Sequence, residues 1–244
     1  MTNAAERPDG SNNRSRDRDS AGRPLGEPDL LIFDCDGVLV DSEIIAVEVE
    51  SRLLTEAGFP MTVDEVATTC VGLSYPDMVR VLEERFGRPV PDSLNLRLQQ
   101  ATLAEFPDRL RPVPGIADLL AGSSIERCVA SSSDPDRIAL SLDITGLASR
   151  FPIERVFSAT MVQRGKPAPD LFLHAARRTG HRPDRCLVIE DSPHGVEAAV
   201  AAGMAVIGFV GGGHARPALT DRLLAAGANR VVDHHDAVAE LIGG

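Results

Sequence analysis

Short apolar segments alternate with amphipathic helical patterns along most of this chain, and this alternation is the strongest constraint on its fold. The apolar segments are rich in Val and Ile and lack polar alternation, as expected of strands covered on both faces. Helical repeats such as Phe172, Ala175, Ala176 and Thr179 lie between several of them. Strands that alternate with helices predict an α/β fold with an open, mostly parallel sheet. The predicted strands are 29–34, 125–130, 155–158, 186–189, 205–210 and 230–232.

One long stretch interrupts the alternation. Residues from about 43 to 110 show helical patterns and no convincing strand. The simplest interpretation is a small helical domain inserted after the first strand, joined to the rest by linkers near 40–43 and 111–115. The predicted organisation is a disordered tail at 1–28, a core domain formed by 29–42 and 112–244, and a helical domain at 43–111.

The charge balance limits the classes of partner. Lys and Arg number 25 and Asp and Glu number 36, which gives a formal net charge of −11. A general nucleic-acid binder needs a basic face that neutralises phosphates, so we expect no nucleic-acid partner. The stretch 198–213 has no polar side chain, but it is shorter than the roughly 20 residues that span a bilayer, so no membrane association is expected.

The cysteines indicate a compartment. Cys35, Cys70, Cys128 and Cys186 show no zinc-site spacing, and three of them lie in apolar segments. Buried free thiols are typical of proteins in a reducing environment. We therefore predict a cytoplasmic protein, and we expect a monomer or a weak homodimer.

Reactive side chains follow four of the predicted strands. Ligands of open α/β sheets bind beyond the carboxyl ends of the strands, so these side chains are expected on one rim. Each alone has an ordinary explanation as a turn, a helix cap or a surface residue, but their conjunction in this order favours a catalytic site. They are Asp34 and Asp36 after the first strand, Ser131, Ser132 and Ser133 after the second, Lys166 downstream of the third, and Glu190 and Asp191 after the fourth.

These motifs together resemble those of the haloacid dehalogenase-like superfamily, in the branch with a helical cap inserted after the first catalytic strand. The resemblance spans about 29–240 and implies a Rossmann-like parallel-sheet core under a small α-helical cap. The motifs that carry it are DCDGVLVDSE at 34–43, Ser131 after the strand CVA, KPAPD at 166–170 and EDSPHG at 190–195.

The resemblance implies a phosphatase that hydrolyses a small phosphorylated metabolite, either a sugar phosphate or a phosphorylated sugar acid, through an aspartyl-phosphate. Asp34 would be the nucleophile, and Asp36 would protonate the leaving oxygen and then activate water. Ser131 would donate a hydrogen bond to the transferring phosphoryl group, aided by backbone N–H groups around Ser132. Lys166 would neutralise charge on the nucleophile and the phosphoryl oxygens.

The resemblance also implies Mg²⁺ as the cofactor, an ion that prefers hard oxygen ligands in octahedral geometry. Its ligands would be the Asp34 carboxylate, the Asp36 backbone carbonyl and Asp191. Glu190 would either bind the metal directly or support the residues that do.

Two related reactions are disfavoured and one alternative stays open. Asp36 is an acid, as in the phosphate-transferring members, which argues against dehalogenation. The stretch 43–110 contains no Lys, which argues against phosphonate hydrolysis through a Schiff base. The alternative is a phosphosugar mutase of the β-phosphoglucomutase type. Those proteins carry His where this chain has Ala46 and Arg in the loop where it has Tyr75, so both differences favour the phosphatase.

Substrate selection is expected in the cap and the loops it meets. The candidates for substrate contact are Glu43, Gly72, Ser74 and Tyr75, with Leu73 and Arg80 beside them. A solvated helix face is the favoured interpretation for Arg80. His214, in a glycine-rich loop after the fifth strand, is a further candidate.

Overall fold

The computed structural model describes residues 27–71 and 73–243. The prediction of a disordered tail falls almost wholly outside the described residues, and so does Gly72. The described residues form a six-stranded parallel sheet with the order β3-β2-β1-β4-β5-β6, which confirms the predicted α/β fold class and all six strands. The strands are β1 (Leu30–Phe33), β2 (Glu126–Ser131), β3 (Val156–Ser158), β4 (Cys186–Glu190), β5 (Ala205–Phe209) and β6 (Arg230–Val232).

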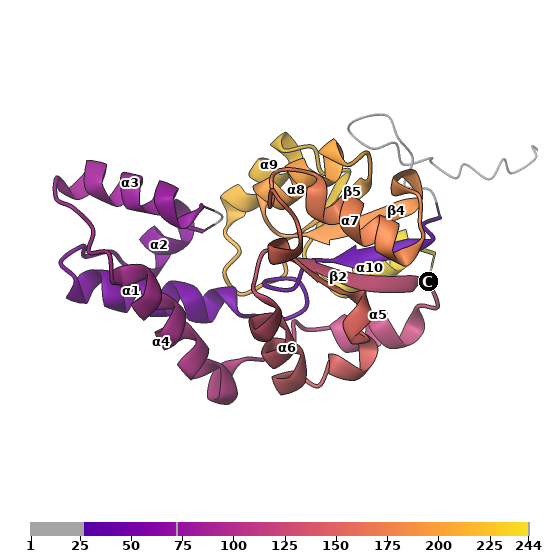
Figure 1. The fold of residues 1–244 in the computed structure, drawn as a ribbon, viewed down its shortest axis with the longest axis horizontal. Coiled ribbons are helices and arrows are strands. Elements are labelled where there is room, and N and C mark those ends of the chain that lie inside the picture. The colour runs from indigo at the N-terminus through magenta and orange to yellow at the C-terminus, as the bar shows by residue number, and fades with distance from the viewer. Residues whose placement is uncertain (1–26, 72, 244) are drawn as a thin grey trace, which may run out of the picture.

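Both faces of the sheet are covered by helices, as the apolar strands require. Successive side chains of a strand point to opposite faces. In β1, Leu31 and Phe33 belong to one buried apolar cluster, and Leu30 and Ile32 belong to the other. The first face is covered by α5 (Ile116–Gly122), α6 (Pro135–Ile144) and α10 (His235–Leu241), and the second by α7 (Asp170–Thr179), α8 (Pro193–Ala201) and α9 (Pro217–Ala225) (Figure 1).

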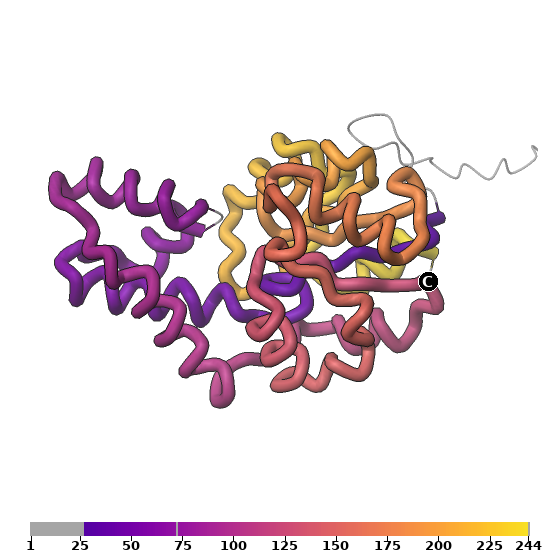
Figure 2. The backbone as a smooth tube through the Cα atoms, viewed as in Figure 1, coloured from indigo at the N-terminus to yellow at the C-terminus, as the bar shows by residue number. Residues whose placement is uncertain are grey.

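Four helices lie beside the sheet rather than on it, at the left of Figures 1 and 2. All four lie within the stretch 43–110 where helices were predicted, and three of them have 12 or more residues. The other, α2, begins at a capping box in which the Thr62 side chain accepts from the Glu65 N–H and the Glu65 carboxylate accepts from the Thr62 N–H. These helices are α1 (Glu43–Glu56), α2 (Val63–Thr69), α3 (Tyr75–Phe86) and α4 (Leu94–Arg109).

The two segments that join these helices to the sheet run side by side. The Asp41 N–H donates to the Arg111 carbonyl at 2.9 Å, and the Val113 N–H donates to the Leu39 carbonyl at 3.0 Å. Val40 and Pro112 form an antiparallel bridge between them. The chain therefore leaves the sheet and returns to it through two adjacent segments that are hydrogen-bonded to each other.

All four cysteines are buried and free, as predicted. Within the part of the chain that the structure describes, no helix is both long enough and apolar enough to cross a membrane.

Candidate active site

The candidate site lies where the order of the sheet reverses. From β1 the chain builds outward through β2 and β3, and it then returns to the other side of β1 with β4, β5 and β6. Crevices beyond the carboxyl ends of the strands at such a reversal are where α/β sheets bind ligands. Asp34 follows β1, Ser131 ends β2, and Glu190 ends β4, so the structure brings these predicted residues together.

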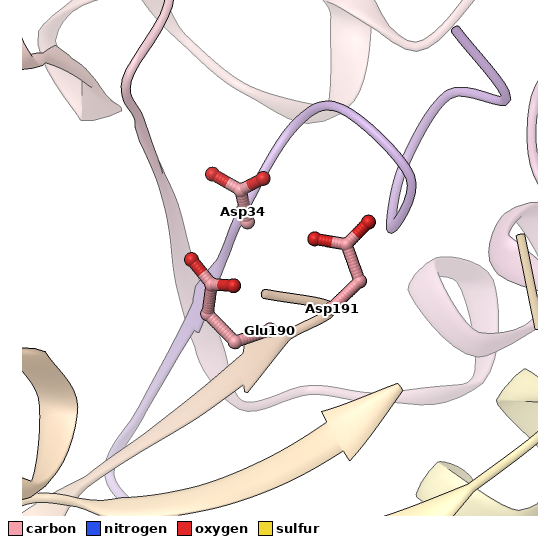
Figure 3. A group of neighbouring side chains, drawn as sticks. All are labelled: Asp34, Glu190 and Asp191. Atoms are coloured by element: carbon pink, nitrogen blue, oxygen red, sulfur yellow. The ribbon is translucent and has the colours of Figure 1, made fainter. Parts of the chain in front are cut away.

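Three carboxylates meet at this point (Figure 3). Asp34, Glu190 and Asp191 each offer one oxygen, and these oxygens lie within 4.8 Å of one another. All three residues are buried. Buried like charges at this separation repel strongly and require a compensating cation.

Lys166 supplies one such cation. Its Nζ donates to Asp34 Oδ1 at 2.7 Å, to Glu190 Oε1 at 2.6 Å and to the Ala130 carbonyl at 3.0 Å, so all three of its N–H bonds are used. The side chain is 4% exposed. Burial lowers the pKa of Lys166, but the charges of Asp34 and Glu190 outweigh burial and raise the pKa above its ordinary value. The ammonium is therefore charged at every physiological pH.

The carboxylates remain only partly compensated. Burial raises the pKa of Asp34 to about 7 with the help of Glu190 and Asp36, and Lys166 opposes this shift. Burial and the charges of Glu190 and Asp34 also raise the pKa of Asp191 well above its usual value. A divalent cation among these oxygens would favour the charged forms of both carboxyls.

Glu190 and Asp191 are held in different ways. One oxygen of Glu190 accepts from Lys166, and the other accepts from the backbone N–H and the hydroxyl of Ser192 at 2.8 and 2.9 Å. For Asp191, the one side-chain partner among the described residues is the ring of His214, with Nε2 at 3.4 Å from Oδ2. Glu190 is thus fully engaged by protein donors, whereas Asp191 keeps oxygen lone pairs for a ligand.

Two glycines make room for these carboxylates. A Cβ on Gly195 would lie 1.8 Å from Glu190 Oε1, and a Cβ on Gly37 would lie 1.8 Å from Asp191 Oδ2. Gly37 also has a φ of 77°, a value that side chains other than glycine rarely adopt. The glycines in the motifs at 34–43 and 190–195 are therefore steric requirements of the carboxylate cluster.

Asp36 is held by three donors rather than by the carboxylate cluster. Its Oδ1 accepts from Ser42 Oγ at 2.6 Å and from Arg137 Nη2 at 2.9 Å, and its Oδ2 accepts from Ser133 Oγ at 2.6 Å. Burial raises the pKa of Asp36, but Arg137 and the two hydroxyls outweigh burial and lower the pKa. In this arrangement Asp36 is a carboxylate.

A cavity of about 550 Å³ opens between the carboxylates and the helical segment, which lines it with α1 and with residues of the loop between α2 and α3. Its wall includes the predicted catalytic residues, which are Asp34, Asp36, Ser131 and Lys166, and also the neighbouring Ser132. Ser131 is buried, and its Oγ accepts from the Ser133 N–H at 3.1 Å, which leaves the hydroxyl proton of Ser131 free to be donated. His214 also lines the cavity, and burial lowers its pKa to about 4, so its ring is neutral.

The candidate substrate residues divide into two groups. Glu43, Leu73 and Ser74 line the cavity, whereas Tyr75 is absent from its described wall and packs against the apolar cluster. Gly72 lies outside the described residues. Arg80 is exposed and pairs with Asp77, as expected of a solvated helix face.

Sequence analysis gave no role to Arg137 or Glu50, and it placed Ser133 on the rim without identifying its partner. Arg137 and Ser133 both bind Asp36, and Glu50 contributes a second carboxylate from α1. Arg137 is 101 positions from its partner, and no local pattern connects the two. The signal for Glu50 was available, because it lies seven positions after Glu43 and therefore on the same helical face.

Comparisons with known proteins find a matching family, similar sequences and similar structures. Residues 31–209 match the family described as haloacid dehalogenase-like hydrolase. A protein from Escherichia coli (strain K12) named 6-phosphogluconate phosphatase is 27% identical over 190 residues, which cover 78% of this chain and 86% of that protein. The matches confirm the resemblance carried by the motifs and the predicted class of enzyme.

Two solved structures share the whole fold. A haloacid dehalogenase-like protein of unknown function from Agrobacterium tumefaciens is 40% identical, with a TM-score of 0.83, over 88% of this chain and 97% of that one. A hydrolase of the same family from Deinococcus radiodurans R1, solved with bound phosphate and sodium, is 31% identical, with a TM-score of 0.75, over 88% of this chain and 96% of that one.

Proposed function

We propose, since this chain belongs to the haloacid dehalogenase-like hydrolase family, that it is a magnesium-dependent phosphatase of a small phosphorylated carbohydrate and acts through an aspartyl-phosphate. The observation that carries the proposal is the position of Lys166, whose ammonium contacts Asp34 and Glu190 at once in the cavity wall. A carboxylate can approach an anionic phosphate only where cations neutralise both groups.

In the first step Asp34 attacks phosphorus, so that a bond forms from its carboxylate oxygen to phosphorus and the bond to the leaving oxygen breaks. Asp36 is a carboxylate when Arg137, Ser42 and Ser133 bind it, so it must first leave these donors and take up a proton from solvent, and it then gives that proton to the leaving oxygen. In the second step Asp36 takes a proton from water, which attacks phosphorus and releases the Asp34 carboxylate. Because Asp36 is bound by Ser42, Ser133 and Arg137 in this structure, the first step requires it to exchange these donors for the leaving oxygen.

The donor set fits a hard divalent cation. The oxygens of Asp34 and Asp191 are close together, buried and incompletely compensated, and Mg²⁺ prefers such carboxylates. We assign direct contact to these two residues and to the Asp36 carbonyl. Glu190, whose oxygens are already engaged, positions Lys166 and the turn at Ser192. When bound, Mg²⁺ supplies charge that lets the nucleophile approach the phosphoryl group.

The other residues of the cavity take supporting roles. Ser131 is proposed to donate its free hydroxyl proton to a phosphoryl oxygen, and backbone N–H groups around Ser132 are proposed to provide further donors. The helical segment 43–111 is proposed to act as a cap that closes over the core 29–42 and 112–244 during the reaction and excludes bulk water. The buried free thiols favour a reducing, cytoplasmic setting.

The test is phosphate release from a panel of phosphosugars, phosphorylated sugar acids, phosphoglycolate and nucleotides. The assay is run with Mg²⁺, with a chelator, and with Asp34→Asn as the blank. Release that needs Mg²⁺ and is lost in the variant is the expected result. Phosphoryl transfer to a second position of the sugar, with no free phosphate, would instead establish the mutase. No turnover of any compound would contradict the proposal.

A further inference from the structure

One face of α1 forms part of the cavity wall. Glu43, Ala46 and Glu50 all line the cavity from this helix, at spacings that place them on one face. At a rise of 1.5 Å per residue, the two glutamates lie about 10 Å apart along the helix axis. The small side chain of Ala46 leaves space between them, so a ligand there would meet a carboxyl group at each end.

These two carboxyls already repel each other. Burial raises the pKa of Glu50 to about 8, and the charge of Glu43 contributes while Arg137 opposes it. Burial and the charge of Asp36 likewise raise the pKa of Glu43 to about 7, again opposed by Arg137. Near neutral pH, a negative charge on either glutamate is therefore unfavourable in this part of the cavity.

Nothing on the helical side compensates this charge. Among the described residues of α1–α4 and their loops, none that lines the cavity is a Lys or an Arg. The nearest cation is Arg137, which comes from α6 and is paired with Asp36. Lys166 is likewise engaged by Asp34 and Glu190. Arg222 of α9 also lines the cavity, but among the described residues Arg137 is the only cation whose charge shifts the pKa of Glu43 and Glu50.

We infer, on the basis of the proposed phosphatase function, that Glu43 and Glu50 select phosphate monoesters with an uncharged polyol as the leaving group. Hydroxyl groups can donate to a carboxylate and accept from a protonated carboxyl, so a polyol satisfies both glutamates in either state. A leaving group with a carboxylate or a second phosphate would place like charges together in a partly dehydrated site. The E. coli relative is named for the phosphate of a sugar acid, and this chain is inferred to differ from it in substrate.

The test compares substrates that differ only in charge. Glucitol 6-phosphate and 6-phosphogluconate are open chains that differ by a CH₂OH group in place of a carboxylate. Fructose 1-phosphate and fructose 1,6-bisphosphate differ by a second phosphate. At pH 9, where Glu43 with a pKa of about 7 and Glu50 with a pKa of about 8 are both ionised, we expect kcat/KM to favour the uncharged member of each pair by roughly 100-fold, because the other member places like charges side by side.

The variants separate charge from fold. In the double variant Glu43→Gln/Glu50→Gln, the preference within each pair should fall to about tenfold or less. A general loss of activity cancels from this ratio, so an effect on folding alone would leave the ratio unchanged. Glu56→Gln is the matched control, because Glu56 lies on the same helix, is exposed and pairs with Arg97; its ratio should equal that of the wild type.

Several results would overturn the inference. Equal kcat/KM within both pairs would do so while leaving the phosphatase proposal intact. The same holds for a ratio that stays at its wild-type value in the double variant. A preference for glucosamine 6-phosphate over glucose 6-phosphate of more than about tenfold would show that the two glutamates select a cation instead. Failure to hydrolyse any of these esters would overturn both the inference and the proposed function.

Discussion

Replacement of Lys166 by methionine should destabilise the protein in a pH-dependent manner. Lys166 is the only lysine in the sequence, and its ammonium is the cation that separates Asp34 from Glu190. Methionine has a similar length and no charge, so Lys166→Met leaves two buried carboxylates unpaired with little change in volume. Breaking a buried ion pair by removing one partner costs about 3–5 kcal/mol.

That free energy can be converted into a melting temperature. For a chain of this size, 1 kcal/mol of stability corresponds to roughly 2–4 °C, so at pH 8 we expect Tm to fall by about 6–20 °C. The assay is thermal and urea unfolding followed by far-UV circular dichroism, because the chain has no Trp and a single Tyr. A chelator is included so that no divalent cation takes the place of the ammonium.

The pH dependence follows from the carboxyls. The pKa of Asp34 is already raised to about 7 in the folded protein, against an ordinary value of 3.8, and the loss of Lys166 would raise it further. A raised folded pKa means that the folded state binds a proton more tightly than the unfolded chain. As pH falls below that pKa the carboxyl becomes neutral, and the repulsion is relieved. At pH 5.5 the destabilisation should therefore shrink to the 1–3 kcal/mol or so of an unpaired polar group.

Arg164→Met is the matched control. Arg164 lies two positions away, is 67% exposed and pairs with Asp170, so its loss should cost at most about 1 kcal/mol at either pH. The reasoning would be refuted if Lys166→Met destabilised the protein equally at both pH values, or by less than about 1 kcal/mol at pH 8.

Three further predictions concern the same cavity. Gly195→Ala should lower kcat by roughly 100-fold in the phosphate-release assay, because its Cβ would displace Glu190. Gly122→Ala should leave kcat unchanged, because a Cβ there meets nothing within 4 Å, and equal rates for the two variants would disprove the steric argument. His214→Leu should weaken Mg²⁺ binding about tenfold, as measured by calorimetry, because Asp191 loses its only nearby ring partner among the described residues. An unchanged affinity would show that His214 does not position Asp191 for the metal. Small-angle scattering should show compaction with a phosphate mimic and Mg²⁺, and identical profiles would contradict closure of the helical segment.

Strand positions were predictable because their signal is local. A parallel strand buried on both faces reads as a short run of Val, Ile and Leu, and each of the six runs became a strand. The catalytic rim was predictable for a related reason, since residues that follow parallel strands must meet at one edge. Asp34, Ser131 and Glu190 are therefore neighbours in space although they are far apart in the chain.

Contacts between distant side chains were not predictable in the same way. Arg137 looks like an ordinary residue in the first turns of a helix, and only the packing of α6 against the loop after β1 brings it to Asp36. Tyr75 was placed in the cavity on the basis of its loop position, but an aromatic ring at the start of α3 gains more from apolar packing than from the cavity. The helix α2 has seven residues, too few for a clear periodic pattern, and only its capping box marks its start.

The pairing of the two linkers affects how the helical segment of such proteins can change during evolution. Because residues 39–41 and 111–113 are hydrogen-bonded to each other, the excursion from 43 to 110 begins and ends at almost the same point. For the sheet, that excursion is a closed loop, and the entropy of closing a loop grows only with the logarithm of its length. Helices can then be lengthened, shortened or exchanged there without disturbing the strands that carry the nucleophile. A foreign helical hairpin with adjacent ends should be graftable at the same junction.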